Sequence, residues 1–280
     1  FVEWVPVCPE LEVGMGVPRP VLRLEDGESG IRMIESKSRV DHTPAMTRYS
    51  ERRARQLRRM DLSGYVLKKD SPSCGMTRVN VYRETGMATR DGRGLFASAL
   101  MEACPHLPVE EEGRLNDSKL RENFIERIFA YQRLTQLFRG RWTRKQVVAF
   151  HTAHKLQLMA HSTVAYRELG RLVAGLKDTP RAEFRERYES GFMEALSKVA
   201  TRGRNTNVLQ LAAGTFKRSL DSAARTELSD LIHDYRTGLL PIIVPITLIR
   251  HYASLLQVDY LMEQAYLSPH PKELALRSRI

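Results

Sequence analysis

Two cysteines, Cys8 and Cys74, each lie in a short proline-containing loop that follows an apolar, strand-like run. The first loop is Val-Pro-Val-Cys-Pro-Glu, residues 5–10, and the second is Ser-Pro-Ser-Cys-Gly, residues 71–75. Such a loop can hold a thiol rigidly at the end of a strand, where the thiolate faces a cleft or binds a metal. The alternative for each cysteine is a small buried hydrophobic residue.

Small polar and acidic residues surround both thiols. Glu10 follows Cys8 by two residues and would act as a general base toward water, or else be an exposed loop carboxylate. Ser71 and Ser73 can donate hydrogen bonds to a sulfur or an oxyanion, and Gly75 permits close approach of a ligand. The alternative for the second loop is a plain turn with a buried cysteine.

Other candidate residues give weaker signals. Cys104 lies near a helix end without useful polar neighbours, which favours a structural role. Three histidines, His151, His154 and His161, could share a helix face, but a zinc site usually adds a carboxylate or thiolate and no HExxH pattern is present, so core or interface positions are favoured. The segment from Gly14 to Pro20 predicts a tight loop with Arg19 available for an anion.

Residues 1–114 predict an α/β domain. Strands are expected at residues 4–8, 64–68 and 79–83, with helices at 43–60, opened by Thr43 and Pro44, and at 94–102. The succession of strand, helix and strand predicts a Rossmann-like parallel sheet. Residues 105–115 contain two prolines and three consecutive glutamates and predict a linker.

Residues 115–280 predict an all-α helical bundle, because strand signals are almost absent there. Helices are expected at residues 117–138, 143–160, 164–176, 180–199, 207–217, 223–236 and 245–256, with a short one after Pro271. Thr143 and Gln146 form a capping-box pattern.

Composition bounds the class of protein. The 280 residues carry a net charge of +11, which favours an anionic partner, although the arginines are spread along the chain and a generally basic protein is the alternative. No apolar stretch is long enough for a membrane span, and residues 1–20 do not show the n-region and h-region pattern of a secretory signal. Three cysteines make no disulfide framework, so a cytoplasmic location is expected.

Two sets of motifs resemble known families. The segment Cys8-Pro-Glu-Leu-Glu-Val-Gly-Met-Gly-Val-Pro-Arg-Pro20 and the segment Lys69-Asp-Ser-Pro-Ser-Cys-Gly75 resemble the thiouracil desulfidases of the TudS type (domain of unknown function 523). The second half, with Phe150-His-Thr-Ala-His-Lys155 and Tyr266-Leu-Ser-Pro-His-Pro271, resembles the YbgA-type domain (domain of unknown function 1722).

The resemblance implies a [4Fe-4S] cluster that removes sulfur from 2-thiouracil or a related thiopyrimidine without redox change. It implies that Cys8 and Cys74 are cluster ligands, that Glu10 is the acid/base, and that Ser71 or Ser73, with Ser71 favoured, contacts the substrate. The family's early Ser-Ser-Cys-Leu-Leu-Gly segment and following Tyr-Asp-Gly stretch are missing. We therefore expect the third cysteine ligand upstream of Phe1; Cys104, which lies outside the matching motifs, is the less favoured substitute. Poor cluster binding, or zinc in its place, is expected for these 280 residues.

Two further hypotheses concern partners. In the first, the basic helical domain docks RNA and delivers thiolated tRNA nucleotides to the first domain. The arginine-rich face of residues 48–59, together with Lys155, Lys217 and Arg250, would supply the phosphate contacts. Alternatively, the helical half is a structural or dimerising unit. Free base, nucleoside and tRNA remain alternative substrates, and the oligomeric state is open.

Overall fold

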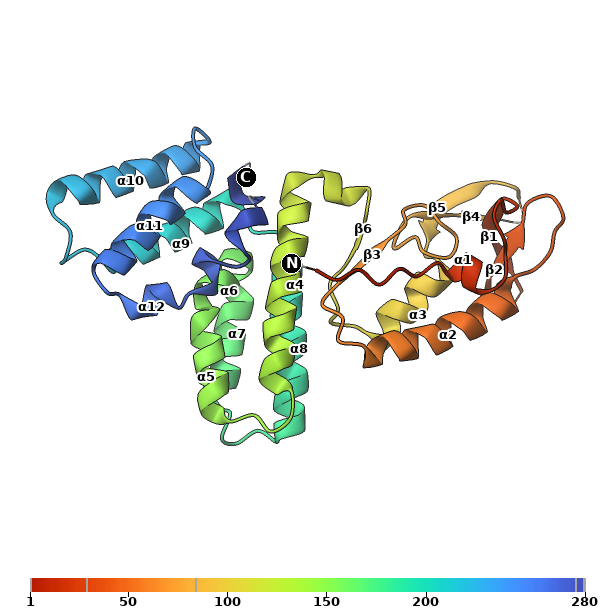
Figure 1. Ribbon diagram of the computed structural model, residues 1–280, viewed down its shortest axis with the longest axis horizontal. Coiled ribbons are helices and arrows are strands. Elements are labelled where there is room, and N and C mark those ends of the chain that lie inside the picture. The colour runs from red at the N-terminus through yellow and green to blue at the C-terminus, as the bar shows by residue number, and fades with distance from the viewer. Residues whose placement is uncertain (1, 29, 84, 275, 279–280) are drawn as a thin grey trace. The chain divides into compact units, whose positions relative to one another are not determined.

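The computed structural model describes residues 2–28, 30–83, 85–274 and 276–278. The chain divides into two compact units, Phe1–Asn116 and Asp117–Ile280, which Figure 1 shows in red to yellow and in green to blue. Each unit has its own hydrophobic core and is described by itself. Among the described residues, no helix is both long and apolar enough to cross a lipid bilayer.

The first unit contains a four-stranded sheet in the order β2-β1-β4-β5 and a separate two-stranded sheet of β3 and β6. The pairs β1–β2 and β4–β5 are antiparallel, whereas β1–β4 and β3–β6 are parallel. The strands are β1 (Leu22–Gly27), β2 (Gly30–Glu35), β3 (Tyr65–Leu67), β4 (Val79–Tyr82), β5 (Ala88–Gly92) and β6 (Val109–Glu111).

The prediction of a Rossmann-like parallel sheet is not confirmed, because the larger sheet is mixed. Residues 4–8, predicted as a strand, form no ladder, and most of their side chains are exposed. The segment predicted as a linker, residues 105–115, contains β6, whose two glutamates are buried. Their carboxylates are satisfied there: Glu110 accepts from the Arg114 side chain at 2.7 Å and Glu111 from the Met76 amide at 2.8 Å.

Three helices accompany these strands: α1 (Pro9–Glu12), α2 (Thr43–Arg59) and α3 (Leu95–Ala103). The longer two, α2 and α3, pack side by side (Figure 1) and bury Met46, Leu57 and Phe96. The helix predicted at 43–60 is confirmed, with His42 rather than Thr43 at the cap position. The Thr43 hydroxyl instead accepts a hydrogen bond from the Met33 amide of β2 at 2.8 Å, which ties α2 to the sheet.

The start of α3 lies directly against the second cysteine loop. The amides of Phe96 and Ala97 donate to the carbonyl of Ser73 at 2.9 and 3.1 Å. Gly94, which precedes the helix, has no room for a side chain: an added Cβ would lie 2.4 Å from the carbonyl carbon and oxygen of Ser73. Glycine is therefore required sterically where these two segments meet.

The second unit is helical, as predicted. The long helix predicted from residue 143 to 160 is two helices separated at His154, and a helix at 259–262 was not predicted. Asp117 and the Thr143–Gln146 capping box begin their helices as expected. The helices are α4 (Ser118–Phe138), α5 (Arg144–Ala153), α6 (Lys155–His161), α7 (Thr163–Ala174), α8 (Arg181–Ser197), α9 (Arg202–Gly214), α10 (Ser222–Thr237), α11 (Ile243–Leu255) and α12 (Asp259–Met262).

Two clusters of buried side chains form the core of the helical unit. One joins α4, α5, α7 and α8 around the aromatic rings of Phe138, Trp142 and Tyr188. The other joins α9, α10 and α11 around Phe216 and Tyr252, whose ring centroids lie 6.0 Å apart. Such interdigitated aromatic and aliphatic packing gives this unit an independent source of stability.

Replacing Gly94 by alanine should lower the free energy of unfolding by about 2 kcal/mol or more, because the new methyl group overlaps the backbone of Ser73. The matched control is Gly203→Ala in α9, where an added Cβ meets nothing within 4 Å and better helix propensity should raise stability by about 0.5–1 kcal/mol. Urea unfolding of both variants measures the difference. Equal stability of the two variants would contradict the close contact of α3 with the cysteine loop.

Candidate active site

The first cysteine loop turns directly into a short helix. Cys8 has extended backbone angles and precedes α1, and its carbonyl accepts from the Glu12 amide at 2.9 Å. Pro9 suits the first helical position, where no amide hydrogen is needed. The turn points Glu10 toward the second cysteine loop, while Glu12 lies 3.7 Å from the Arg53 side chain of α2. Of the two acidic residues in this helix, Glu10 is therefore the one that joins the candidate site.

The second cysteine loop is shaped by its own serine. The Ser71 hydroxyl accepts from the amides of Cys74 and Ser73 at 3.1 and 3.3 Å, and the Ser71 carbonyl accepts from the Gly75 amide at 2.8 Å. These bonds close a tight turn around the thiol. An added Cβ at Gly75 would lie 2.9 Å from the Ser71 carbonyl oxygen, so the turn requires glycine there.

The two loops converge on the carboxylate of Glu10. Its Oε1 accepts from the Ser73 hydroxyl at 2.6 Å and from the Ser71 hydroxyl at 3.2 Å. The two hydroxyl oxygens lie 3.0 Å apart, and the Ser73 hydroxyl also lies 3.5 Å from the Cys74 sulfur. A hydroxyl group has a single proton to donate, and the shorter contact shows that Ser73 donates it to Glu10 rather than to the Cys74 sulfur. Five predicted site residues, Cys8, Glu10, Ser71, Ser73 and Cys74, therefore lie in one place.

Arg19 completes this cluster. Its Nε lies 3.1 Å from Oε2 of Glu10, and its terminal nitrogen lies 3.9 Å from the Cys8 sulfur. The sequence predicted an anion-binding role for Arg19, and the anion it contacts in the structure is the Glu10 side chain. One carboxylate oxygen is thus bound by hydroxyl groups and the other by a guanidinium, which fixes the orientation of Glu10.

The Cys74 thiol is held in its neutral form. Burial raises its pKa to about 11, the Ser73 hydroxyl lowers it, and the negative charges of Glu10 and Cys8 raise it further. Tyr65 of β3 is near enough to this thiol for a Cys74 thiolate, together with burial, to raise the pKa of the phenol. A bound cation would reverse this balance, since metal ions deprotonate the thiols that coordinate them.

The other predicted candidates lie elsewhere. Cys104 follows the last residue of α3, eight residues from Phe96, which corresponds to roughly 12 Å along the helix axis. The three histidines are buried and bind separate partners: His151 the Tyr188 hydroxyl, His154 the Phe150 carbonyl and His161 the Lys198 carbonyl. Burial lowers the pKa of His151 and His154 to about 4. These are core residues, as the sequence favoured.

The donor atoms fit an iron–sulfur cluster only in part. Cys8 and Cys74 are soft thiol donors beside one carboxylate, which suits iron or zinc. Within the described part of the chain, no group of three or more His, Cys, Asp and Glu side chains is arranged as metal ligands. The described residues therefore offer two of the three thiolates that the resemblance implies.

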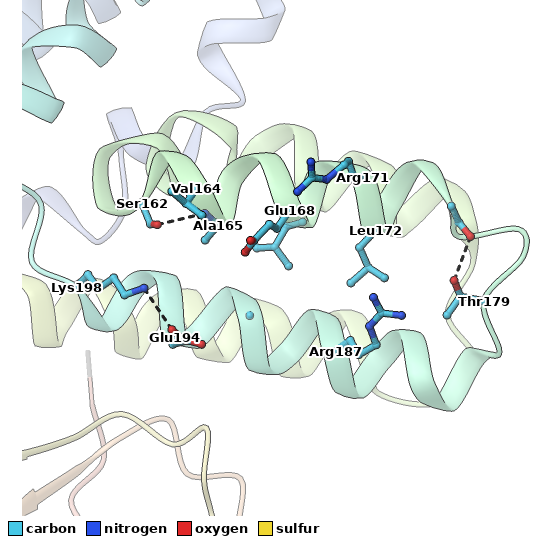
Figure 2. Close-up of a pocket in the computed structure, with 13 residues that line it drawn as sticks. Ser162, Val164, Ala165, Glu168, Arg171, Leu172, Thr179, Arg187, Glu194 and Lys198 are labelled. Atoms are coloured by element: carbon cyan, nitrogen blue, oxygen red, sulfur yellow. Dashed lines mark hydrogen bonds and ion pairs between the residues drawn. The ribbon is translucent and has the colours of Figure 1, made fainter.

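A groove in the helical unit is lined by none of these residues. Figure 2 shows it between α7 and α8 of the helical unit, with a volume of about 530 Å³. Leu169, Leu172 and Gly191 line it together with charged side chains such as Arg171 and Glu194. The clustered thiols, hydroxyls and carboxylate belong to the first unit instead.

The thiols, the hydroxyls and the oriented carboxylate thus cluster on the first unit. In the comparison with known proteins, residues 1–112 match the family model of 2-thiouracil desulfurase, and residues 155–271 match that of a protein of unknown function, DUF1722. The YbgA protein of Escherichia coli K12 is 32% identical over 164 residues, which are 58% of this chain and 97% of that protein. No solved structure matches. The chain thus belongs to the YbgA (DUF1722) family and carries in addition a 2-thiouracil desulfurase family domain.

In the metal-free protein, alkylation of Cys74 should rise about tenfold per pH unit and level off only near pH 11, because the thiolate is the reacting form. Glu10→Gln removes a negative charge that raises the pKa of Cys74, so the midpoint of the Cys74 titration should shift to lower pH. Glu12→Gln is the matched control. Mass spectrometry of the Cys74 peptide measures the rate. A titration midpoint for Cys74 near the ordinary thiol value of about 8.5 would contradict a buried thiol beside Glu10. A midpoint that Glu10→Gln leaves unchanged would contradict it as well.

Proposed function

We propose that the first unit replaces the sulfur of 2-thiouracil, or of a related thiopyrimidine, by the oxygen of water. The balance is one thiocarbonyl and one water giving one carbonyl and one hydrogen sulfide, with no oxidant or reductant. The family match of residues 1–112 supports the reaction class. The observation that carries the proposal is the Glu10 carboxylate held by Ser73 and Arg19 beside the Cys74 thiol.

Glu10 is the proposed acid/base. A carboxylate whose orientation is fixed on both oxygens can take a proton from an attacking water and return it to the departing sulfur. Arg19 holds Glu10 in place through their ion pair, and also places a positive charge 3.9 Å from the Cys8 sulfur. Preorganised charges of this kind lower the reorganisation needed as negative charge moves during the reaction.

The two serines differ in how available they are. Ser73 is 1% exposed and donates the shorter bond to Glu10, so we assign it the role of orienting that carboxylate. Ser71 is half-buried and its bond to Glu10 is longer, at 3.2 Å. Its hydroxyl is therefore the one we assign to the substrate or intermediate.

Cys8 and Cys74 are the proposed thiolate ligands of a [4Fe-4S] cluster. When bound, such a cluster would supply an iron site that accepts the sulfur of the substrate. The protein's own contribution is to hold both thiols next to Glu10 and Arg19, where the positive charge of the cluster would favour the ionised Cys74.

Replacing Glu10 by glutamine should reduce the turnover of 2-thiouracil to uracil by about 10²–10⁴-fold, since the amide cannot accept a proton. The measurement is uracil formation by anaerobically reconstituted protein, with the iron content determined in parallel. Glu12→Gln, in the same short helix, should keep nearly full activity. Full turnover of Glu10→Gln at unchanged iron content would remove Glu10 from the chemistry.

A second candidate function is binding of RNA that carries the thiolated base. The outer face of α2 presents Arg48, Arg55 and Arg59, spaced by seven and four residues and all exposed. A row of exposed guanidiniums along one helix face suits a phosphate backbone. This helix belongs to the same unit as the cysteine cluster.

The RNA hypothesis predicts binding that weakens steeply with salt. Changing Arg48, Arg55 and Arg59 to glutamine should reduce the affinity for tRNA. The slope of the logarithm of the binding constant against the logarithm of the salt concentration should become shallower by about 0.7 for each phosphate that is no longer neutralised. Arg187→Gln, on an exposed face of α8, is the control. Filter binding over a salt series measures both. The absence of binding at low salt, or an unchanged slope in the triple variant, would argue against this role of α2.

A further inference from the structure

The helical unit contains a cavity, with several charged side chains in its lining, that the proposed function does not use. Its volume is about 320 Å³, within the range of small-molecule sites. It lies between α4, the end of α6, the start of α9 and the C-terminal segment, and all of its lining residues belong to this unit. Two carboxylates, Glu122 and Glu126, line it one helical turn apart on α4.

The two carboxylates have unequal partners. Glu126 is fully engaged: Gln157 donates to Oε1 at 2.8 Å, the Arg277 guanidinium approaches Oε1 at 3.5 Å, and His161 lies 3.5 Å from Oε2. Burial raises its pKa, but the neighbouring charges and hydrogen bonds prevail and lower it to about 2. Glu126 is therefore an ionised structural anchor of this interior.

The two carboxylate oxygens of Glu122 differ in their hydrogen-bond partners. Its Oε1 accepts from Arg277 at 3.0 Å and faces His270 at 3.1 Å. Its Oε2 is buried and, within the described residues, has no hydrogen-bond partner, although the side chain is only 4% exposed. A buried acceptor without a donor is unfavourable, so a ligand with an N–H group would be stabilised there.

The exposed edge of the cavity has the opposite character. Lys119 and Arg202 line it and are exposed to solvent. The Arg202 guanidinium lies 5.4 Å from the ring centroid of Tyr235 and donates to the Tyr235 carbonyl at 2.9 Å, which fixes its position. Two cations at the edge favour an anionic group, whereas Glu122 inside favours a donor.

We propose that this cavity binds a small metabolite that donates an N–H group to Glu122 and presents an anionic group to Lys119 and Arg202. Two kinds of molecule share this chemistry. Free amino acids have an ammonium and a carboxylate, and nucleoside monophosphates have base N–H groups and a phosphate. The proposal concerns the helical unit alone and does not rest on the desulfuration of thiouracil.

The test is a thermal-shift screen of the full chain with single amino acids and single nucleoside monophosphates, each at ~10 mM, well above the ~1 mM Kd of a weak site. One of the two classes should raise the Tm by roughly 3–6 °C. Calorimetric titration with that compound should then give a Kd at least tenfold weaker for Glu122→Gln and several-fold weaker for Lys119→Met. Glu186→Gln, an exposed residue of α8, should bind normally.

Lys119 is exposed, so its variant keeps the test meaningful if Glu122→Gln fails to fold. A shift by amino acids alone or by nucleotides alone identifies the source of the ligand. The absence of a Tm shift with every compound would overturn the proposal. Binding that is unaffected by both Lys119→Met and a folded Glu122→Gln would overturn it as well.

Discussion

The geometry of the site depends on the hydrogen bonds that Ser73 makes through both its backbone carbonyl and its side-chain hydroxyl. Its carbonyl accepts from the first amides of α3, its hydroxyl donates to Glu10 of α1, and its side chain is almost fully buried. The orphan amides at a helix start need acceptors, and here a loop carbonyl supplies one. The close approach is possible because Gly94 has no side chain. The separation of Cys74 from Glu10 is thereby set by packed backbone rather than by mobile side chains.

The electrostatic environment of this cluster keeps the Cys74 thiol neutral. Burial, Glu10 and Cys8 all favour a neutral Cys74 thiol, and Arg19 is committed to Glu10. A site of this kind binds a positive centre through its thiols more readily than it acts as a free thiolate nucleophile. This is why the sulfur-accepting role is assigned to a bound cluster in our proposal and the proton transfer to Glu10.

Local sequence signals predicted much of the site and less of the sheet. The residue types around Cys8 and Cys74 pointed to their cluster, and proline, glycine and cap signals placed α2 and α3. The hairpin of β1 and β2 was missed although alternating side chains flank Gly27 and Gly30. The apolar run before Cys8 was wrongly predicted as a strand, because within the described residues it pairs with no other strand. The network of Glu122 and Arg277 joins residues 155 positions apart, which no local pattern can predict.

In our proposal, the protein exchanges sulfur for water oxygen at a thiopyrimidine carbon, and Glu10 transfers the proton. The most direct measurement follows anaerobically reconstituted protein acting on 2-thiouracil in ¹⁸O-labelled water, with mass spectrometry of the base and quantification of sulfide. The account predicts uracil with one ¹⁸O atom per molecule and an equal amount of sulfide, without added oxidant or reductant. Unlabelled uracil, a requirement for a reductant, or unchanged 2-thiouracil in protein of full iron content would contradict it.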